Sequence, residues 1–356
     1  MTTPTPVSAE QIRAERADHA QLRDRDFADK FNITEAQLVA AFSGAGVTRI
    51  EANPDVVFPR LEELGEVMAL TRNDSCVIEK VGRYSHYQGG VHASLVLTEE
   101  IDLRLFPRHF VTAFAVERDG KNGTARSLQF FDAAGDAVHK IHLREASDLA
   151  AWGRIVADLA LPEQSDTLEV APRTPPEGAK SDPDKVDVLR AEWAKMTDTY
   201  QFLRLCSKLK MNRLGAYRIA GEPLARKLPT DTVTPMLEAV REQEIEVMIF
   251  VGNRGCIEIH GGPVRNLREM GPWQNILDPG FDLHLRLDHV AEVWAVNKPT
   301  KRGDAVSYEA FDADGTILFQ VFGRRTDDND SRPAWDAIVA ALPSLQAETR
   351  AEPETV

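Results

Sequence analysis

The sequence has few cysteines and no long apolar run, and both absences limit the kind of protein it can be. Its three cysteines, Cys76, Cys206 and Cys256, are odd in number and widely spaced. That spacing fits neither a disulfide framework nor a CxxC metal site. No uncharged apolar run approaches the ~20 residues that span a bilayer, and the polar N-terminal segment lacks the apolar core of a secretory signal. We therefore predict a cytoplasmic, reduced protein without membrane insertion.

Positive charge is also scarce. The chain has 42 Lys+Arg against 56 Asp+Glu, which gives a formal net charge of −14. Proteins that bind nucleic acids or anionic membranes without specificity need excess basic residues, so these partner classes are disfavoured. The sequence also lacks a Gly-rich phosphate loop, HExxH, GxSxG and the Rossmann fingerprint. Any anionic ligand must therefore be held by a local basic pocket.

The most informative feature present is an internal repeat: the chain matches itself without a gap at a shift of 180 residues. Asn73 aligns with Asn253, and FDAAG at 131–135 aligns with FDADG at 311–315. A fixed shift sustained over a long stretch indicates a duplicated domain. Composition and the repeat predict an N-terminal repeat at 1–161, a Pro/acidic linker at 162–185, a C-terminal repeat at 186–345 and an acidic tail at 346–356.

Within each copy, helical patterns precede alternating strand patterns. Residues 9–30, 34–43 and 186–209 have helical spacing and few helix breakers. The D-A-x-G turns within 131–141 and 311–321 separate two apolar runs, which is typical of a β-hairpin. Because no long helical crossovers separate the strands, the sheets should be antiparallel. The predicted class is α+β, built by tandem duplication.

The helix expected at 186–209 carries a continuous apolar stripe. Its members follow 3-4-3-4-3 spacing and are Val186, Leu189, Trp193, Met196, Tyr200 and Leu203. From spacing alone, Tyr200 is expected to be a core tyrosine with its hydroxyl hydrogen bonded. Arg204 follows one turn later on the same face.

A basic segment follows this stripe. Residues 204–227 contain one acidic residue, Glu222, against Arg204, Lys208, Lys210, Arg213, Arg218, Arg226 and Lys227. Such a run is commonly a solvated face. In a chain of this net charge, it could equally be a clamp for an anionic ligand.

The two copies also differ at one informative position. IDLRLF at 101–106 is expected to be a strand with Asp102 and Arg104 on its more polar face. His284 occupies the position of Arg104 in the second copy. Duplicated domains commonly form one shared site and let one copy lose its half, although divergence on a solvent face fits these residues equally well.

Several long segments, in order, are similar to the HemS/ChuS-type haemin-utilisation proteins, which are bacterial haem-trafficking and haem-degrading factors. The segments are GEVMALTRND (65–74), IDLRLF (101–106), SLQFFDAAGDAVHKI (127–141), MGPWQNILDPGFDLHLRLDHVAEVWAVNKPT (270–300) and FGRR (322–325). The resemblance implies two stacked antiparallel sheets flanked by helices. It also implies one haem (iron protoporphyrin IX) in a cleft between helices and sheet.

The resemblance assigns roles to individual residues. Arg104 matches the distal arginine that faces the iron or its bound water, and is the implied catalytic residue. Arg213, Lys298 and Arg325 match contacts to the haem propionates, which favour charge-assisted bonds. Without the resemblance, Lys298 would be expected to be a solvated surface lysine and Arg325 a charge at a strand end.

One departure from the family pattern concerns the iron ligand. The family usually has its proximal histidine at the position of Tyr200, and no histidine occurs from 143 to 259. Tyr200 could ligate ferric iron as a phenolate, favoured by the charge of the iron and of Arg204. Alternatively, haem is bound through another residue, or tight haem binding is lost and the chain is a scaffold or interaction protein.

The implied function is to accept imported haem for storage, delivery or reductant-dependent degradation that releases iron. A phenolate stabilises Fe(III) over Fe(II), so we expect holding and delivery to be favoured over a non-canonical haem oxygenase-like activity. Degradation would require an external electron donor. The implied partners are haem and either the cytoplasmic side of a haem ABC transporter or a downstream haem acceptor.

Overall fold

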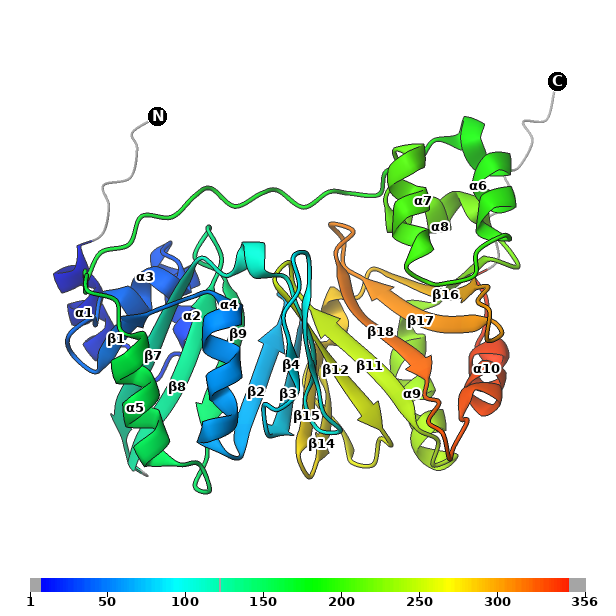
Figure 1. Ribbon diagram of the computed structural model, residues 1–356. Coiled ribbons are helices and arrows are strands. Elements are labelled where there is room, and N and C mark those ends of the chain that lie inside the picture. The colour runs from blue at the N-terminus through cyan, green and yellow to red at the C-terminus, as the bar shows by residue number, and fades with distance from the viewer. Residues whose placement is uncertain (1–7, 122, 346–356) are drawn as a thin grey trace. The chain divides into compact units, whose positions relative to one another are not determined.

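The computed structural model describes residues 8–121 and 123–345 (Figure 1). The chain forms two compact units. The first contains residues up to Pro175 together with Phe250–Gly261 and Asn275–Leu285. The second contains Pro176–Ile249, Gly262–Gln274 and the residues from Arg286 onward. The predicted acidic tail, 346–356, lies outside the described residues.

The helices lie in two groups along the chain. Those of the first unit are α1 (Ala9–Asp18), α2 (Asp24–Phe31), α3 (Glu35–Ala40), α4 (Pro54–Val57) and α5 (Leu149–Leu159). Those of the second are α6 (Val186–Trp193), α7 (Gln201–Leu209), α8 (Arg213–Ala220), α9 (Val233–Glu242) and α10 (Arg332–Ala341). Among the residues that the structure describes, no helix is long and apolar enough to cross a bilayer.

The strands of the first copy are β1 (Val47–Ile50), β2 (Val67–Arg72), β3 (Cys76–Gly82), β4 (Tyr87–Gln88), β5 (Ser94–Leu97), β6 (Asp102–Leu105), β7 (Thr112–Gly120), β8 (Gly123–Phe131) and β9 (Ala137–Leu143). Those of the second are β10 (Ala225–Leu228), β11 (Val247–Gly252), β12 (Cys256–Gly262), β13 (Leu267–Met270), β14 (Trp273–Asp278), β15 (Phe281–Arg286), β16 (Glu292–Lys298), β17 (Ala305–Phe311) and β18 (Ile317–Gly323). They form two nine-stranded antiparallel sheets, ordered β1-β7-β8-β9-β2-β3-β15-β14-β13 and β10-β16-β17-β18-β11-β12-β6-β5-β4. The predicted α+β class with antiparallel sheets is confirmed.

The strand order shows that the two copies exchange strands. β15, from the second copy, pairs with β3 of the first, with His284 opposite Val77. β6, from the first copy, pairs with β12 of the second, with Arg104 opposite Ile257. These two pairings are related by the 180-residue shift. The exchange explains why the first compact unit contains two segments of the second half of the chain.

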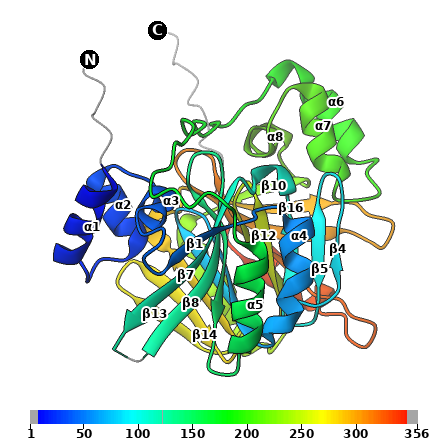
Figure 2. The same cartoon turned by 60° about the vertical axis from the view of Figure 1, so that its left-hand side comes forward.

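Helices cover the sheets in both units. α3 and α5 pack against β1, and α3 also contacts β7 (Figures 1 and 2). α10 packs against β17 and β18, and α6, α7 and α8 form a separate helical group (Figure 2).

The single helix predicted at 9–30 is instead two helices, α1 and α2. The chain leaves the helix after Asp18 because Arg16 donates to the carbonyl oxygens of His19, at 2.8 Å, and Leu22, at 2.9 Å. Both acceptors lie beyond the last residue of α1, so the two bonds stabilise the turn that separates α1 from α2. The helix predicted at 34–43 is shorter than expected and begins with a Thr34–Gln37 capping box.

The predicted linker contains no strand, and its only helical turn is the short 3-10 turn Pro183–Lys185. Its backbone nevertheless forms hydrogen bonds with the elements of both units, as two examples show. In the first unit, the Ala171 N–H donates to the carbonyl of Ala133 at 2.7 Å. In the second, the carbonyl of Gly178 accepts from the side chain of Asn212 at 2.7 Å. The linker boundaries remain a prediction from composition.

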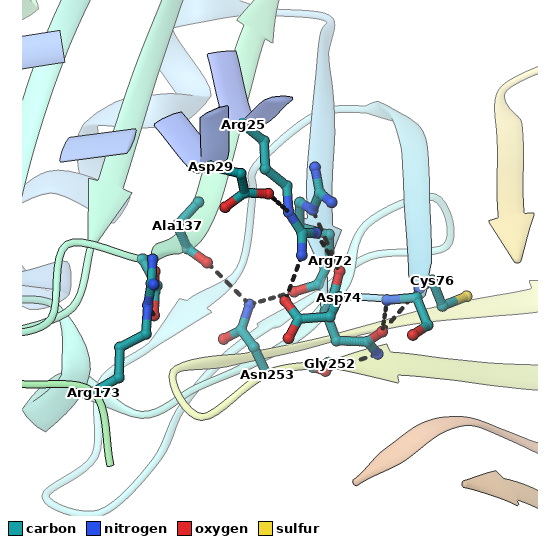
Figure 3. Close-up of polar contacts among 12 residues, drawn as sticks. Arg25, Asp29, Arg72, Asp74, Cys76, Ala137, Arg173, Gly252 and Asn253 are labelled. Carbon is teal, nitrogen blue, oxygen red and sulfur yellow. Dashed lines mark hydrogen bonds and ion pairs between the residues drawn. The ribbon is translucent and has the colours of Figure 1, made fainter. Parts of the chain in front are cut away.

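Two equivalent asparagines join the β2–β3 and β11–β12 hairpins. Each accepts hydrogen bonds within its own turn: Asn73 from Ser75 and Cys76, and Asn253 from Gly255 and Cys256. Each also donates to the other hairpin, Asn73 to the Gly252 carbonyl at 3.3 Å and Asn253 to the Arg72 carbonyl at 2.9 Å (Figure 3). The repeated asparagine therefore ties the two copies together.

The core of the first unit encloses two ionisable side chains, His139 and Glu258, whose nearest nitrogen and oxygen lie 4.0 Å apart. The two ring nitrogens of His139 form hydrogen bonds with the hydroxyls of Thr71, at 2.8 Å, and Tyr84, at 2.5 Å, and burial lowers the pKa of the ring to about 3. Glu258 is fully buried, and neither of its carboxyl oxygens has a hydrogen-bond partner within the described residues. Burial raises its pKa to about 8. Both groups are therefore largely neutral at pH 7.

The asparagine pair predicts a large effect for a small substitution. Asn253→Ala should lower the free energy of unfolding by about 2–3 kcal/mol, because it leaves turn amides and partly buried carbonyl groups without partners. Urea unfolding measures the effect. Asn53→Ala is the control, since Asn53 caps α4 through one bond and should cost only about 1 kcal/mol. Equal, small losses in both variants would contradict this role for Asn253.

The raised pKa of Glu258 predicts a pH dependence of stability. The folded state holds this proton more tightly than the unfolded chain, so the stabilisation is present below about pH 4.5 and lost as pH rises through about 8. Glu258→Gln removes this titration. Between pH 5 and 8, the stability of the variant relative to the wild type should rise by about 1.4 kcal/mol per pH unit. Urea unfolding at several pH values measures this slope, and a difference independent of pH would show that Glu258 has an ordinary pKa.

Candidate functional site

The helix predicted at 186–209 is interrupted, and this changes the position of its tyrosine. α6 ends at Trp193 and α7 begins at Gln201. Between them, Asp198 accepts from the Tyr200 N–H and Gln201 accepts from the Thr197 N–H, both at 2.8 Å. These polar side chains compete with helical hydrogen bonding, which the apolar spacing alone did not reveal.

Tyr200 is not a core tyrosine, so the expectation from spacing was wrong. It lies at the N-terminal boundary of α7 with 73% of its surface exposed. Leu203, one turn later, is 52% exposed, and Arg204 is exposed as well. The N-terminal end of α7 therefore presents a phenol, an apolar side chain and a cation to the surface of the second unit.

The basic segment divides into two groups. Within the described residues, the cations of α7 and the residue after it, Arg204, Lys208 and Lys210, are exposed and form no ion pair. The others have internal partners from distant parts of the chain. Arg213 pairs with Glu309, Arg218 and Lys227 pair with Glu292, and Arg226 donates to the carbonyl groups of Val339 and Leu342.

Glu309 is the centre of a buried network in the second unit. Its Oε2 accepts from Arg213 at 3.1 Å and from the Tyr217 hydroxyl at 2.9 Å. Its Oε1 accepts from Lys298 at 2.8 Å and from Ser307 at 2.7 Å. Burial opposes ionisation, but Lys298 and Arg213 outweigh it and lower the pKa of Glu309 to about 2. The network thus joins two cations to one permanently charged carboxylate.

Lys298 and Arg325 occupy contrasting environments. Lys298 is only 4% exposed, so the expectation of a solvated surface lysine was wrong. Burial lowers the pKa of its amine even though Glu309 opposes the shift. Arg325 is exposed, and its backbone forms an isolated β-bridge with Asp330.

Arg104 lies on β6 in the first unit, where the predicted alternation is confirmed. Leu103 and Leu105 are fully buried, whereas Asp102 and Arg104 are partly exposed and form an ion pair with each other. His284, at the equivalent position of β15, bonds to Asn275 at 2.6 Å. Burial lowers the pKa of His284. The equivalent positions therefore carry a cation in one copy and a neutral ring in the other.

Sequence reasoning missed Glu309, Tyr217 and Ser307, although the repeat contained a signal. Residues 180 positions earlier than Ser307 and Glu309 are Ser127 and Gln129, whose side chains bond to each other at 3.0 Å. The second copy thus has a buried carboxylate, Glu309, where the first has the neutral Gln129. Such a difference indicates that cations lie nearby in the second copy only. Across the described ranges, no group of three or more His, Cys, Asp or Glu side chains could hold a metal ion.

Comparison with known proteins identifies the class of this fold. The family described as the haemin-degrading HemS.ChuX domain matches the chain twice, at residues 32–159 and 210–342. The chain belongs to this family, which confirms the resemblance found from the motifs.

Individual relatives cover almost the whole chain. The hemin transport protein HmuS of Yersinia pestis is 36% identical over 92% of this chain and 94% of its own length. The holo structure of PhuS, a heme-binding protein from Pseudomonas aeruginosa, is 38% identical over 95% of this chain and 98% of its own, with a TM-score of 0.90. The heme degrading enzyme ChuS of Escherichia coli O157:H7 is 32% identical over 92% and 96%, with a TM-score of 0.84.

The Glu309 network predicts a strong dependence of stability on this carboxylate. Glu309→Gln should lower the free energy of unfolding by about 3–5 kcal/mol, because it leaves Lys298 and Arg213 without their buried anion. Urea unfolding measures the loss. Glu292→Gln is the matched control: its partners Arg218 and Lys227 have side chains 48% and 42% exposed, so its loss should stay near about 1 kcal/mol. Similar losses in both variants would contradict a buried charge network.

Proposed function

We propose that this chain binds haem in the cytoplasm and that Tyr200 ligates the ferric iron as a phenolate. The observation that carries the proposal is the exposure of Tyr200, 73%, at the start of α7. A core tyrosine with a bonded hydroxyl could not reach a ligand. Membership of the haemin-degrading family supplies the ligand class.

The side chains around Tyr200 fit the chemistry of haem. Leu203 offers exposed apolar surface for a porphyrin face, and Arg204 places a cation on the same helix end. Bound haem supplies a ferric iron that accepts an axial oxygen donor, a form of ligation known for tyrosine. The start of α7 therefore combines a ligand, an apolar contact and charge compensation.

The remaining assignments follow from the family and stay predictions. Arg104 is expected to lie on the distal side of haem, and Arg213 and Arg325 are expected to contact its propionates. An anionic oxygen donor favours ferric over ferrous iron, so the proposed role is holding and delivery of haem rather than efficient degradation. The proposed partners are a haem transporter at the membrane and a downstream haem acceptor.

A haemin titration of the full chain tests the proposal. The wild type should bind haemin stoichiometrically and give a high-spin ferric spectrum with a phenolate charge-transfer band. Tyr200→Phe should abolish the band, because the variant keeps the ring and loses the oxygen. Tyr87→Phe, which changes a partly exposed tyrosine of the first unit, is the control and should keep it.

Two results would contradict the proposal. A band that persists unchanged in Tyr200→Phe would exclude ligation by this residue, and absence of saturable haemin binding would exclude the haem-binding role. Adding a reductant to the loaded protein then separates delivery from degradation. Slow loss of the haem spectrum is expected, whereas rapid ring opening with iron release would show an efficient enzyme.

A further inference from the structure

The Lys298 amine has two hydrogen-bond acceptors and two aromatic rings around it inside the second unit. Its Nζ donates to Glu309 at 2.8 Å and to the Tyr217 hydroxyl at 3.0 Å. The same atom lies 5.1 Å from the centre of the Phe202 ring and 5.2 Å from that of the Tyr217 ring. Ammonium groups above aromatic faces are held by cation–π attraction, which strengthens when water is excluded. The charge of Lys298 is therefore satisfied within the protein.

The aromatic partner of Lys298 belongs to the first turn of α7. Phe202 is two residues after Tyr200 and is only 1% exposed. Its ring packs against Trp193 of α6, at 4.4 Å between centres, and stacks on Tyr217 of α8 at 5.4 Å. Lys298 on β16 thus contacts α7 through Phe202 and α8 through Tyr217. These contacts connect the first turn of α7 to Lys298.

A carboxylate of an external ligand would have to compete with this arrangement. To reach one, the Lys298 amine would have to leave Glu309 and both rings, and Glu309 would keep only Arg213 as a cationic partner. Removing one member of a buried charge network is costly. Arg213 differs, because its side chain is 24% exposed and only one of its nitrogens bonds to Glu309. Its remaining donors are suited to an external anion.

We propose that Lys298 is a positioning residue, which fixes the first turn of α7 and so places Tyr200, and that it does not bind a haem carboxylate. The inference rests on the proposed function, since it concerns the same site. The proposed role differs from the propionate contact that the family resemblance implies for Lys298. External carboxylates are left to Arg213 and the exposed cations of the surface.

A ligand pair tests the two roles of Lys298 against each other. Haemin and its dimethyl ester share the iron and the macrocycle, and the ester replaces the two charged carboxylates with neutral methyl esters. In Lys298→Met, which keeps much of the side-chain volume, both ligands should lose affinity by the same factor, and the ratio of their dissociation constants should stay within about twofold of the wild type. A contact between Lys298 and a propionate would instead change that ratio by about ten- to hundredfold, which would overturn the proposal.

The spectrum of the loaded protein provides the second readout. Because Tyr200 is displaced, the phenolate charge-transfer band of Lys298→Met should shift or weaken. Lys227→Met is the matched control: Lys227 also pairs with a glutamate, Glu292, and lies 5.9 Å from an aromatic ring, that of Trp294, but its side chain is 42% exposed. This control should leave both the band and the ratio unchanged. An unaltered band in Lys298→Met would contradict positioning.

Hydrogen exchange of the haem-free protein separates failure of this inference from failure of the proposed function. In Lys298→Met, the amides of α7 should exchange about tenfold faster than in the wild type, while those of α5 in the first unit should not change. Phe202→Leu, which removes only the ring, should give the same pattern if Lys298→Met folds poorly. Unchanged exchange in α7 would overturn the inference. If the wild type fails to bind haemin, the proposed function is wrong. The hydrogen-exchange rates of the α7 amides in the haem-free protein then still test whether Lys298 holds α7.

Discussion

The exchange of strands between the two copies is the constraint on which the structure depends. β6 of the first copy completes the sheet that contains β12, and β15 of the second completes the sheet that contains β3. The two repeated asparagines, Asn73 and Asn253, hold the hairpins at this exchange by bonding to each other's backbone. Neither copy therefore has a complete sheet of its own, and a change in one half of the chain acts directly on the other.

Duplication has also allowed the copies to diverge in charge where they remain alike in shape. In the second copy, a carboxylate at Glu309 holds Arg213 and Lys298, whereas its counterpart in the first copy is the neutral Gln129. In the first unit, Glu258 replaces the apolar Ile78 of the equivalent position and is buried, with neither carboxyl oxygen hydrogen bonded within the described residues. The same fold therefore accommodates two buried acids in different charge states: Glu309 is charged at pH 7, and Glu258 is largely neutral. The difference arises because the hydrogen-bond and charge partners around each acid decide the cost of burying its charge.

The site follows from the network in the second unit. Phe202 and Tyr217 pack on the Lys298 amine, and the phenol of Tyr200 lies just before this anchored turn, at the surface. The proposed iron ligand must be exposed and yet held in place, and the proposed roles assign these two requirements to different residues, Tyr200 as the ligand and Lys298 as the residue that positions it. Exposed Arg204 and buried Lys298 thus serve the same proposed site in different ways, although both are cations near α7.

The sequence by itself determined the duplication, the α+β class, the antiparallel hairpins, the family and the presence of a tyrosine where a histidine is usual, because these depend on periodicity and on residues read in order. The sequence correctly predicted the alternation of buried and partly exposed residues around Arg104. It did not predict the break between α6 and α7, because the side chains of Asp198 and Gln201 accept backbone hydrogen bonds there in place of helical partners. Only the tertiary structure decided that Tyr200 is exposed and that Lys298 is buried on Glu309. The burial of Lys298 depends on its pairing with Glu309, which also holds Arg213 about 100 residues away in the chain, and no local pattern records which charges meet across that distance.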